Sequence, residues 1–326
     1  MHLYYDWPAY RLTGVDLENH TVALTIRAFD RNSPAMADLL ARCRVVYVND
    51  TGHRLSEEQL VSALRGAEIA IAGTEPFTER VIGSAGRLRI ISRVGSGTDS
   101  IDLRAAAAKG VRVLTTPNAP VQAVAEHTLA LLLSVLRQIP QYNDAIRRGM
   151  TDLKPGTLLS GKRIGIIGLG RIGTRVASML ESLGCHIEYY DPFVPRSPVR
   201  TWLKADSLSV LVAGVDILTL HAPALPDDQP LLDAAILGSC KKGIIIINSA
   251  RGSLIDEDAM ISALENGTIA GAGLDVLPSE PYTGSLLSYP QVIATPHVAS
   301  FTRETRAQME REAVVQIITA LEDGYT

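Results

Sequence analysis

A glycine-rich turn near the middle of the chain carries the clearest chemical signal. Gly168-x-Gly170-x-x-Gly173 follows the short apolar run of residues 163–167 and precedes a helical pattern. Gly168 permits a tight turn, Gly170 lets a pyrophosphate approach the backbone, and Gly173 lets the helix pack closely against the strand. The N–H groups at the start of that helix would face the negative ligand. The residues of this segment expected to form part of the cofactor-binding site are Gly168, Gly170, Arg171, Ile172 and Gly173.

An acidic residue supports this prediction. Asp191 follows a second run of apolar and aromatic residues, 185–190, at about the expected distance of roughly 20 residues from the turn. A carboxylate there can accept hydrogen bonds from both ribose hydroxyls of NAD, and it would repel the 2′-phosphate of NADP. Arg196 lies nearby and could soften that preference. The alternative is an ordinary glycine-rich turn, which the combination of strand, helix and acid disfavours.

Further candidates stand at the ends of other expected strands, where parallel sheets bind their ligands. In residues 93–99, the backbone N–H groups of Ser96 and Gly97 could bind a carboxylate, although a simple glycine turn explains that segment equally well. Arg251 lies in residues 248–252, after an apolar strand, and its planar guanidinium matches a carboxylate through two parallel hydrogen bonds. The alternative for Arg251 is a surface arginine in a turn.

Two acids and a histidine complete the candidates. Asp275 ends the expected strand 271–275, Glu280 follows it, and His297 comes after another strand and Pro296. A histidine is suited to proton transfer near neutral pH. Taken singly, each acid would be structural and His297 would be a buried, hydrogen-bonded side chain.

Two further histidines compete with His297. His127 lies in the middle of a helical pattern rich in Ala and Leu, so we expect a structural or supporting role for it. His221 ends a strand beside the expected cofactor site, and we expect it to line the adenosine side.

Composition limits the class of protein. The chain has 326 residues, is 46% hydrophobic and 20% charged, and carries a net charge of −4, which is typical of a soluble protein with two domains. The absence of a basic block argues against nucleic acid or an anionic membrane as the main partner. The apolar runs are too short to span a bilayer, and the first residues do not resemble a signal peptide. Cys43, Cys185 and Cys240 are isolated, which predicts no metal site and no disulfide, three small buried residues with Cys240 the most exposed, and a cytoplasmic protein.

Short strands alternate with helices through the first part of the chain, which favours a parallel α/β sheet. The expected elements of this part are residues 22–29, 34–41, 44–48, 56–64, 67–72, 78–85, 88–94, 103–109 and 111–115. A long helical pattern at 121–148, interrupted at Pro140, then breaks the alternation, which resumes at Arg163. The later expected strands are 217–220, 243–248, 271–275 and 292–294, and a final helix is expected at 303–322. We therefore expect two Rossmann-like, doubly wound parallel-sheet domains with a cleft between them.

Taken together and in order, these motifs resemble the D-isomer-specific 2-hydroxyacid dehydrogenase family, over essentially the whole chain. The residues that carry the resemblance are the glycine turn, Asp191, His221-x-Pro223, residues 249–252, Gly273-x-Asp275-Val276, Glu280-Pro281 and Thr295-Pro296-His297, with further matches at 95–102 and 124–128. The resemblance implies a flavodoxin-like substrate domain made of residues 1–120 and 299–326, and an NAD-binding Rossmann domain at 121–298. It also implies a homodimer packed through residues 121–148.

The resemblance further implies a mechanism. Arg251 would bind the carboxylate and carbonyl of a 2-keto acid, helped by the N–H groups of Ser96 and Gly97. His297 would donate a proton to the carbonyl oxygen as NADH delivers hydride to C2, and would act as base in the reverse direction. Glu280 would hydrogen-bond the other imidazole nitrogen and favour the protonated ring. The remaining cofactor contacts that the resemblance implies are His221, Pro223, Ser249, Ala250 and Asp275, the last at the nicotinamide carboxamide.

Departures from relatives narrow the substrate. Formate dehydrogenases of this fold carry Gln where Glu280 stands, so Glu280 argues for a hydroxy acid, while phosphite dehydrogenase remains an alternative. Residues 72–76 lack the Arg that phosphoglycerate dehydrogenases often have, and Glu75 would repel a phosphate. A non-catalytic NAD-sensing corepressor is the alternative from another class. The loops expected to choose the substrate are residues 4–7, 50–54 and 73–77.

Overall fold

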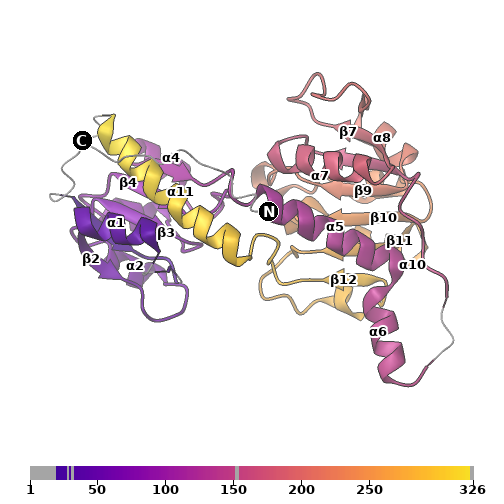
Figure 1. Cartoon of the computed structure of the whole chain (residues 1–326), viewed down its shortest axis with the longest axis horizontal. Helices are drawn as coiled ribbons and strands as arrows, with labels where there is room; N and C mark the ends of the chain where they lie inside the picture. Colours follow the sequence, from indigo (N-terminus) through magenta and orange to yellow (C-terminus); the bar gives the residue numbers. More distant parts are fainter. Residues whose placement is uncertain (1–19, 28, 31–32, 151–153, 324–326) are drawn as a thin grey trace. The chain divides into compact units, whose positions relative to one another are not determined.

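The computed structural model describes residues 20–27, 29–30, 33–150 and 154–323, and it divides into two units (Figure 1). One unit runs through Pro120 and resumes at Thr302, and the other spans Val121–Phe301. Each unit is described by itself. Residues 4–7, which we expected to contribute to substrate choice, lie outside the described residues.

The first unit contains a five-stranded, all-parallel sheet with the order β2-β1-β3-β4-β5, the flavodoxin-like order. Its strands are β1 (Thr21–Leu24), β2 (Arg44–Val48), β3 (Ile69–Ala72), β4 (Ile90–Arg93) and β5 (Arg112–Thr115). Its helices are α1 (Pro34–Arg42), α2 (Glu57–Ala63), α3 (Glu79–Ser84), α4 (Leu103–Ala108) and α11 (Arg303–Glu322).

The last helix of the chain completes the core of this first unit. α11 begins after Thr302, whose hydroxyl accepts the Thr305 N–H, and in Figure 1 it runs alongside α1 as the yellow helix. Its buried residues, including Val314 and Ile317, pack with Val22 and other sheet residues into one apolar cluster. Burying one such aliphatic side chain contributes about 1.5–3 kcal/mol, so α11 is part of what holds this sheet together.

The second unit contains a seven-stranded, all-parallel sheet with the order β12-β11-β10-β9-β6-β7-β8. Its strands are β6 (Arg163–Ile167), β7 (His186–Tyr190), β8 (Leu203–Lys204), β9 (Ile217–Leu220), β10 (Ile244–Asn248), β11 (Ile269–Leu274) and β12 (Val292–Ala294). Its helices are α5 (Val121–Arg137), α6 (Ile139–Arg147), α7 (Arg171–Ser182), α8 (Leu208–Gly214), α9 (Ala234–Gly238) and α10 (Glu257–Glu265). The chain order reverses on either side of β6, and ligands of such sheets bind at that switch point.

Helix α5 packs closely on the β10–β12 side of this sheet, as Figure 1 shows. The close approach depends on two glycines of β11. A Cβ at Gly271 would lie 2.8 Å from a methyl of Val135, and one at Gly273 would lie 3.1 Å from Cβ of Leu131. α5 ends at Arg137; the next residue, Gln138, has a φ of 51° and precedes α6, which has a proline in its first turn.

Most of the expected elements are present, with shifted ends. The final helix and the strands at 44–48, 217–220 and 292–294 have the expected bounds. The strand expected at 22–29 is wrong at Thr25, Ile26, Arg27 and Phe29, because the Thr25 and Ile26 N–H groups both bond to the Ile71 carbonyl. Asp275 lies one residue beyond its strand rather than in it.

No disulfide joins the three cysteines, all of which lie among the described residues; Cys43 and Cys185 are buried and Cys240 is half-buried. Over the part of the chain that the structure describes, no helix is both long and apolar enough to cross a bilayer. No group of three or more potential metal ligands occurs among these same residues.

Candidate functional site

The glycine turn between β6 and α7 has the shape that a dinucleotide needs. Gly168 has a φ of +87°, and a Cβ there would lie 2.8 Å from the backbone nitrogen of Ala222. A Cβ at Gly173 would lie 2.0 Å from the Gly168 carbonyl oxygen, whereas one at Gly170 would meet no atom within 4 Å. Two glycines are therefore required by crowding within the protein, and the third faces open space where a phosphate could approach.

The start of α7 is suited to an anion. Gly170 is the residue before the helix and has no side chain with which to cap it, so the first helical N–H groups depend on other partners. The first bond within the helix runs from the Thr174 N–H to the Gly170 carbonyl, at 2.9 Å. Arg171 is exposed and Ile172 half-buried. The open face at Gly170 and this uncapped helix start together fit a pyrophosphate.

Asp191 follows β7 and braces the same turn. Its carboxylate is 8% exposed, with Oδ2 accepting the Leu169 N–H and Oδ1 accepting the Phe193 N–H, each at 2.8 Å. Each carboxylate oxygen has a second lone pair, so Asp191 can hold the turn and still accept ribose hydroxyls.

His221 lies directly after β9, against Gly168. Its N–H donates to the Ile167 carbonyl at 2.7 Å, and its Nε2 lies 3.0 Å from Oγ1 of Thr219. Burial lowers the pKa of His221 to about 3, so the imidazole is neutral at working pH. Pro223, two residues further, is exposed.

The Arg251 loop follows β10 and is closed by a residue that the sequence analysis did not single out. Asn248 is 1% exposed, and its side chain both donates to the Arg251 carbonyl (2.8 Å) and accepts the Ala250 N–H (3.0 Å). The Arg251 guanidinium donates to the Ala250 carbonyl at 2.6 Å. Ser249, whose Oγ lies 2.8 Å from Oγ1 of Thr128, ties the loop to α5. The missed signal was a buried amide at the end of an otherwise aliphatic strand.

His297 and Glu280 form a pair in the same unit. His297 Nδ1 lies 2.8 Å from Glu280 Oε1, and their side chains are 46% and 54% exposed. At that exposure the pair adds little stability, but it orients the ring, so that Nε2 is the nitrogen left to exchange a proton with a ligand. His297 has a φ of 53°, a left-handed conformation that is rare for residues other than glycine and gathers at functional sites.

Asp275 holds the loop that carries His297. It is 1% exposed, its Oδ1 accepts the Thr295 hydroxyl (2.6 Å) and the Val298 N–H (2.9 Å), and its Oδ2 accepts the Ala299 N–H (2.8 Å). Burial alone would raise the pKa of Asp275, but hydrogen bonds from His127, Thr295 and the two backbone amides outweigh it and lower the pKa. The sequence analysis did not foresee this supporting role.

The predicted carboxylate-binding turn lies in the first unit, after β4. Gly95 has a φ of +145°, and a Cβ there would lie 2.4 Å from the Arg93 guanidinium. Its N–H donates to Oγ1 of Thr116 at 2.7 Å, which fixes the start of the turn. Ser96 is exposed and Gly97 half-buried. All the other predicted site residues belong to the second unit.

Glu75 also belongs to the first unit and is an unusual acid. It is 1% exposed, and its Oε2 accepts the Gly73 N–H at 2.6 Å. Burial raises its pKa, against the effect of that hydrogen bond and of Arg93 and Arg54. The loop after β3 thus carries a desolvated carboxyl group.

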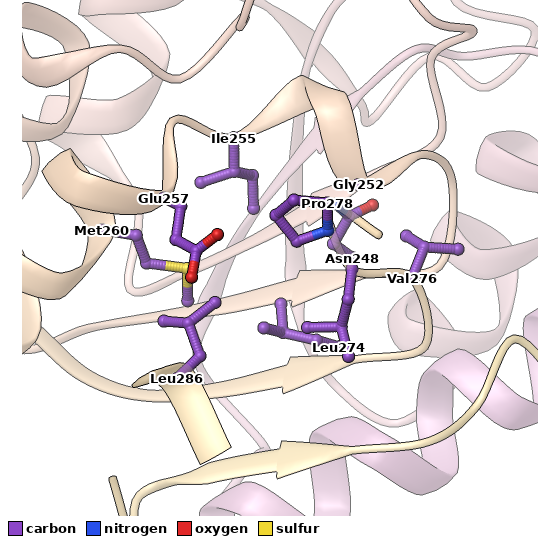
Figure 2. A pocket seen from close by; sticks show the side chains of 10 residues that line it. Asn248, Gly252, Ile255, Glu257, Met260, Leu274, Val276, Pro278 and Leu286 are labelled. Atoms are coloured by element: carbon purple, nitrogen blue, oxygen red, sulfur yellow. The ribbon is translucent and has the colours of Figure 1, made fainter. Parts of the chain in front are cut away.

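A small pocket in the second unit, shown in Figure 2, lies beside the Arg251 loop. Its volume is about 10 Å³, which is room for about one water molecule. Gly252 and Pro278 line one side, and Glu257, Met260 and Leu286 line the other. This pocket is too small for a substrate. The candidate site therefore consists of the loops that follow the strands, and not of this pocket.

Comparison with known proteins agrees with this geometry. The pattern described as "D-isomer specific 2-hydroxyacid dehydrogenase, NAD binding domain" matches residues 129–299. D-3-phosphoglycerate dehydrogenase from Rattus norvegicus is 37% identical over 269 residues, 81% of this chain and 50% of that protein. The chain therefore spans about half the length of the curated relatives it matches.

Solved structures resemble almost the whole chain. A glyoxylate reductase from Paecilomyes thermophila has a TM-score of 0.85 at 27% identity, covering 94% of this chain and 96% of that one. An NADPH-dependent glyoxylate/hydroxypyruvate reductase from Sinorhizobium meliloti, in complex with NADP and malonate, has a TM-score of 0.83 at 29% identity, covering 94% of each chain. The glycine turn, the order of the loop-end residues and these matches agree, and the chain belongs to the D-isomer-specific 2-hydroxyacid dehydrogenase family, with an NAD-binding domain of that family in its second unit.

Proposed function

We propose that this protein reversibly reduces a small 2-keto acid to the D-2-hydroxy acid, with NADH as the reductant. The observation that carries the proposal is the His297–Glu280 pair, held beside the buried Asp275 in the unit that also bears the glycine turn and Arg251. Bound NADH would supply the hydride. The residues of the chain bind the keto acid, orient it and move the proton.

The roles follow from the side-chain chemistry. Arg251 would hold the substrate carboxylate through its planar guanidinium, and Ser96 and Gly97 would offer backbone N–H groups to the same carboxylate. His297 would give a proton from Nε2 to the carbonyl oxygen, while Glu280 at Nδ1 stabilises the charged ring. A reaction without a hydroxyl proton would have no use for this acid–imidazole pair.

The proposed cofactor is NAD rather than NADP. A buried carboxylate at Asp191 suits two ribose hydroxyls and disfavours a 2′-phosphate. The Sinorhizobium meliloti reductase, by contrast, is NADPH-dependent, and titration of this chain with NADH and NADPH tests the preference. The residues proposed to contact the cofactor are Gly168, Gly170, Arg171, Ile172, Gly173, Asp191, His221, Pro223, Ser249, Ala250 and Asp275.

The proposed substrate carries no phosphate. Glu75 places a buried carboxyl group in the loop after β3, where a phosphate-binding enzyme would place a cation. The loops after β1 and β2 enclose a hollow of about 200 Å³ that includes Phe29 and Asp50. Glyoxylate and hydroxypyruvate, which are named for similar structures, fit this description better than a phosphorylated keto acid.

A homodimer in the cytoplasm is part of the proposal. α6 exposes Ile139 and Ile146, at 52% and 74%, which suits a face covered by a second copy. Three cysteines that form no disulfide suit a reducing compartment. The mass of the purified protein in solution, measured for the wild type and for Ile146→Lys, tests the dimer.

The experiment that tests the function is NADH oxidation against a panel of glyoxylate, hydroxypyruvate, pyruvate, branched and aromatic keto acids, and phosphohydroxypyruvate. We expect turnover of an unphosphorylated keto acid that His297→Gln abolishes. Tight NADH binding without turnover of any of them would contradict the proposal and would favour phosphite oxidation or an NAD-sensing role.

A further inference from the structure

Helix α5 touches both of the loops that carry the proposed chemistry, through two neighbouring residues. Thr128 Oγ1 lies 2.8 Å from Ser249 Oγ, two residues before Arg251. His127 Nε2 lies 3.0 Å from Thr295 Oγ1, two residues before His297. One dipeptide on one helix therefore links to both loops.

The hydrogen-bond directions at His127 follow from its neighbours. The Thr295 hydroxyl donates its proton to Asp275 Oδ1 at 2.6 Å, so its oxygen is left to accept. His127 must then donate from Nε2, which also lies 3.3 Å from Asp275 Oδ1. The result is a chain from imidazole to hydroxyl to carboxylate, in which each bond polarises the next.

The carboxylate at the end of this chain holds the backbone on both sides of the acid–base residue. Asp275 accepts the Val298 and Ala299 N–H groups, and its carbonyl accepts the His297 N–H at 2.8 Å. His297 has a left-handed backbone, which costs of order 1–3 kcal/mol and persists only where the surroundings enforce it. The orientation of Asp275 therefore bears directly on where the His297 ring lies.

We propose that His127 is a positioning residue for His297, acting through Thr295 and Asp275. It is not a catalytic residue, because nothing places it against a reacting atom. Its side chain is 23% exposed and Asp275 is fully buried, so the donor reaches the carboxylate from the side of α5. The inference rests on the proposed function for its kinetic consequence, although the hydrogen-bonded chain itself does not depend on it.

The test compares substitutions that keep or remove the donor. His127→Gln places an amide N–H near the Nε2 position, and His127→Leu fills the space without a donor. Thr295→Val breaks the chain at its second member. Glu126→Gln is the control: Glu126 is the exposed neighbour on the same helix, and its carboxylate accepts a hydrogen bond from Gln122.

The measurements are kcat and KM for glyoxylate and hydroxypyruvate, and the NADH dissociation constant. We expect His127→Leu to lower kcat roughly five- to tenfold with NADH binding changed by less than about twofold. We expect His127→Gln to restore most of that loss and Glu126→Gln to match the wild type. The double variant of His127→Leu and Thr295→Val should lose less than the product of the two single losses, because both residues act on the same Asp275 oxygen, which His127 also reaches directly at 3.3 Å.

Three results would overturn the inference: wild-type kcat in a folded His127→Leu, equal losses in the Gln and Leu variants, or additive losses in the double variant. Failure of the function is a separate result, since then the wild type itself reduces none of the keto acids of the panel above. In that event, the rate of amide hydrogen exchange at residues 297–299 tests whether His127 holds this loop. Faster exchange there in His127→Leu than in His127→Gln supports the inference, and equal exchange rejects it.

Discussion

Gly252 lies so close to Leu277 that a Cβ at Gly252 would stand 2.1 Å from the Leu277 carbonyl oxygen. The contact joins the loop of Arg251 to the segment that leads from Asp275 to Glu280. Because the obstacle is backbone on both sides, it cannot be relieved by turning a side chain. A glycine is therefore needed after Arg251 so that the Arg251 loop can pack against the segment between Asp275 and Glu280.

Gly252→Ala tests this contact. The added methyl must push the two segments apart, at a cost of about 1–3 kcal/mol, and we expect a lower melting temperature and a reduced kcat/KM for the keto acid. Gly238→Ala is the control, since a Cβ at the end of α9 would meet no atom within 4 Å. Equal behaviour of the two variants would contradict the packing role.

The acid–base pair makes a prediction about rates. His297→Gln should lower kcat by about 10²- to 10⁴-fold, the usual contribution of a positioned proton donor, with NADH affinity nearly unchanged. Glu280→Gln should cost less, because the imidazole remains. The double variant should be no worse than His297→Gln alone, since Glu280 acts through the ring. Additive losses, or a parallel loss of NADH affinity, would contradict the assignment.

The carboxylate of Asp191 leads to a prediction about the choice between NADH and NADPH. Asp191→Ala removes a charged acceptor, so NADH affinity should fall by roughly 10- to 100-fold while NADPH affinity changes little. The variant also leaves the Leu169 N–H without its acceptor, which lowers stability. Asp191→Asn keeps one acceptor oxygen, which can serve only one of the Leu169 and Phe193 N–H groups, so NADH binding should fall while the melting temperature drops less than in Asp191→Ala. Titration of both cofactors measures this, and unchanged NADH affinity in both variants would remove Asp191 from the ribose site.

Glu75 predicts discrimination against phosphate. Glu75→Gln keeps an acceptor for the Gly73 N–H and removes the negative charge, so the ratio of kcat/KM for phosphohydroxypyruvate to that for hydroxypyruvate should rise. Glu79→Gln, an exposed acid in the first turn of α3, should leave the ratio unchanged. A ratio that moves equally in both variants would point to net charge rather than to this site.

The sequence predicted the parts of the site that depend on local backbone chemistry. The glycine turn needs a positive φ at Gly168 and close packing at Gly173, and both are properties of residue type and spacing. The strands of the second unit were predicted from runs of aliphatic residues. That α11 belongs to the first unit was predicted from the family resemblance and not from the sequence pattern of the helix. Strand ends were misplaced where a neighbour decides them, as Ile71 does for Thr25.

The support for the site could not be read in the same way. The Thr295–Asp275 bond spans 20 residues of the chain, and the Ser249–Thr128 bond spans 121. His127 lies 168 residues from its partner, and its place on an Ala- and Leu-rich helix resembles that of any buried histidine. Such bonds depend on tertiary placement, which residue spacing alone does not encode.

His221 predicts a loss of stability in acid. Burial depresses the pKa of His221 to about 3, below the ordinary 6.5. Between these two pH values the His221 ring is protonated in the unfolded chain and neutral in the folded chain. The free energy of unfolding should therefore fall as pH drops below about 6.5, by up to about 1.4 kcal/mol per pH unit from this group, until the pH nears 3. His221→Gln, which can still bond to Thr219, should flatten that slope in urea titrations across this range. His186→Gln, at an exposed position on β7, should leave the slope of the wild type, and identical slopes in all three proteins would mean that His221 is already protonated in the folded state.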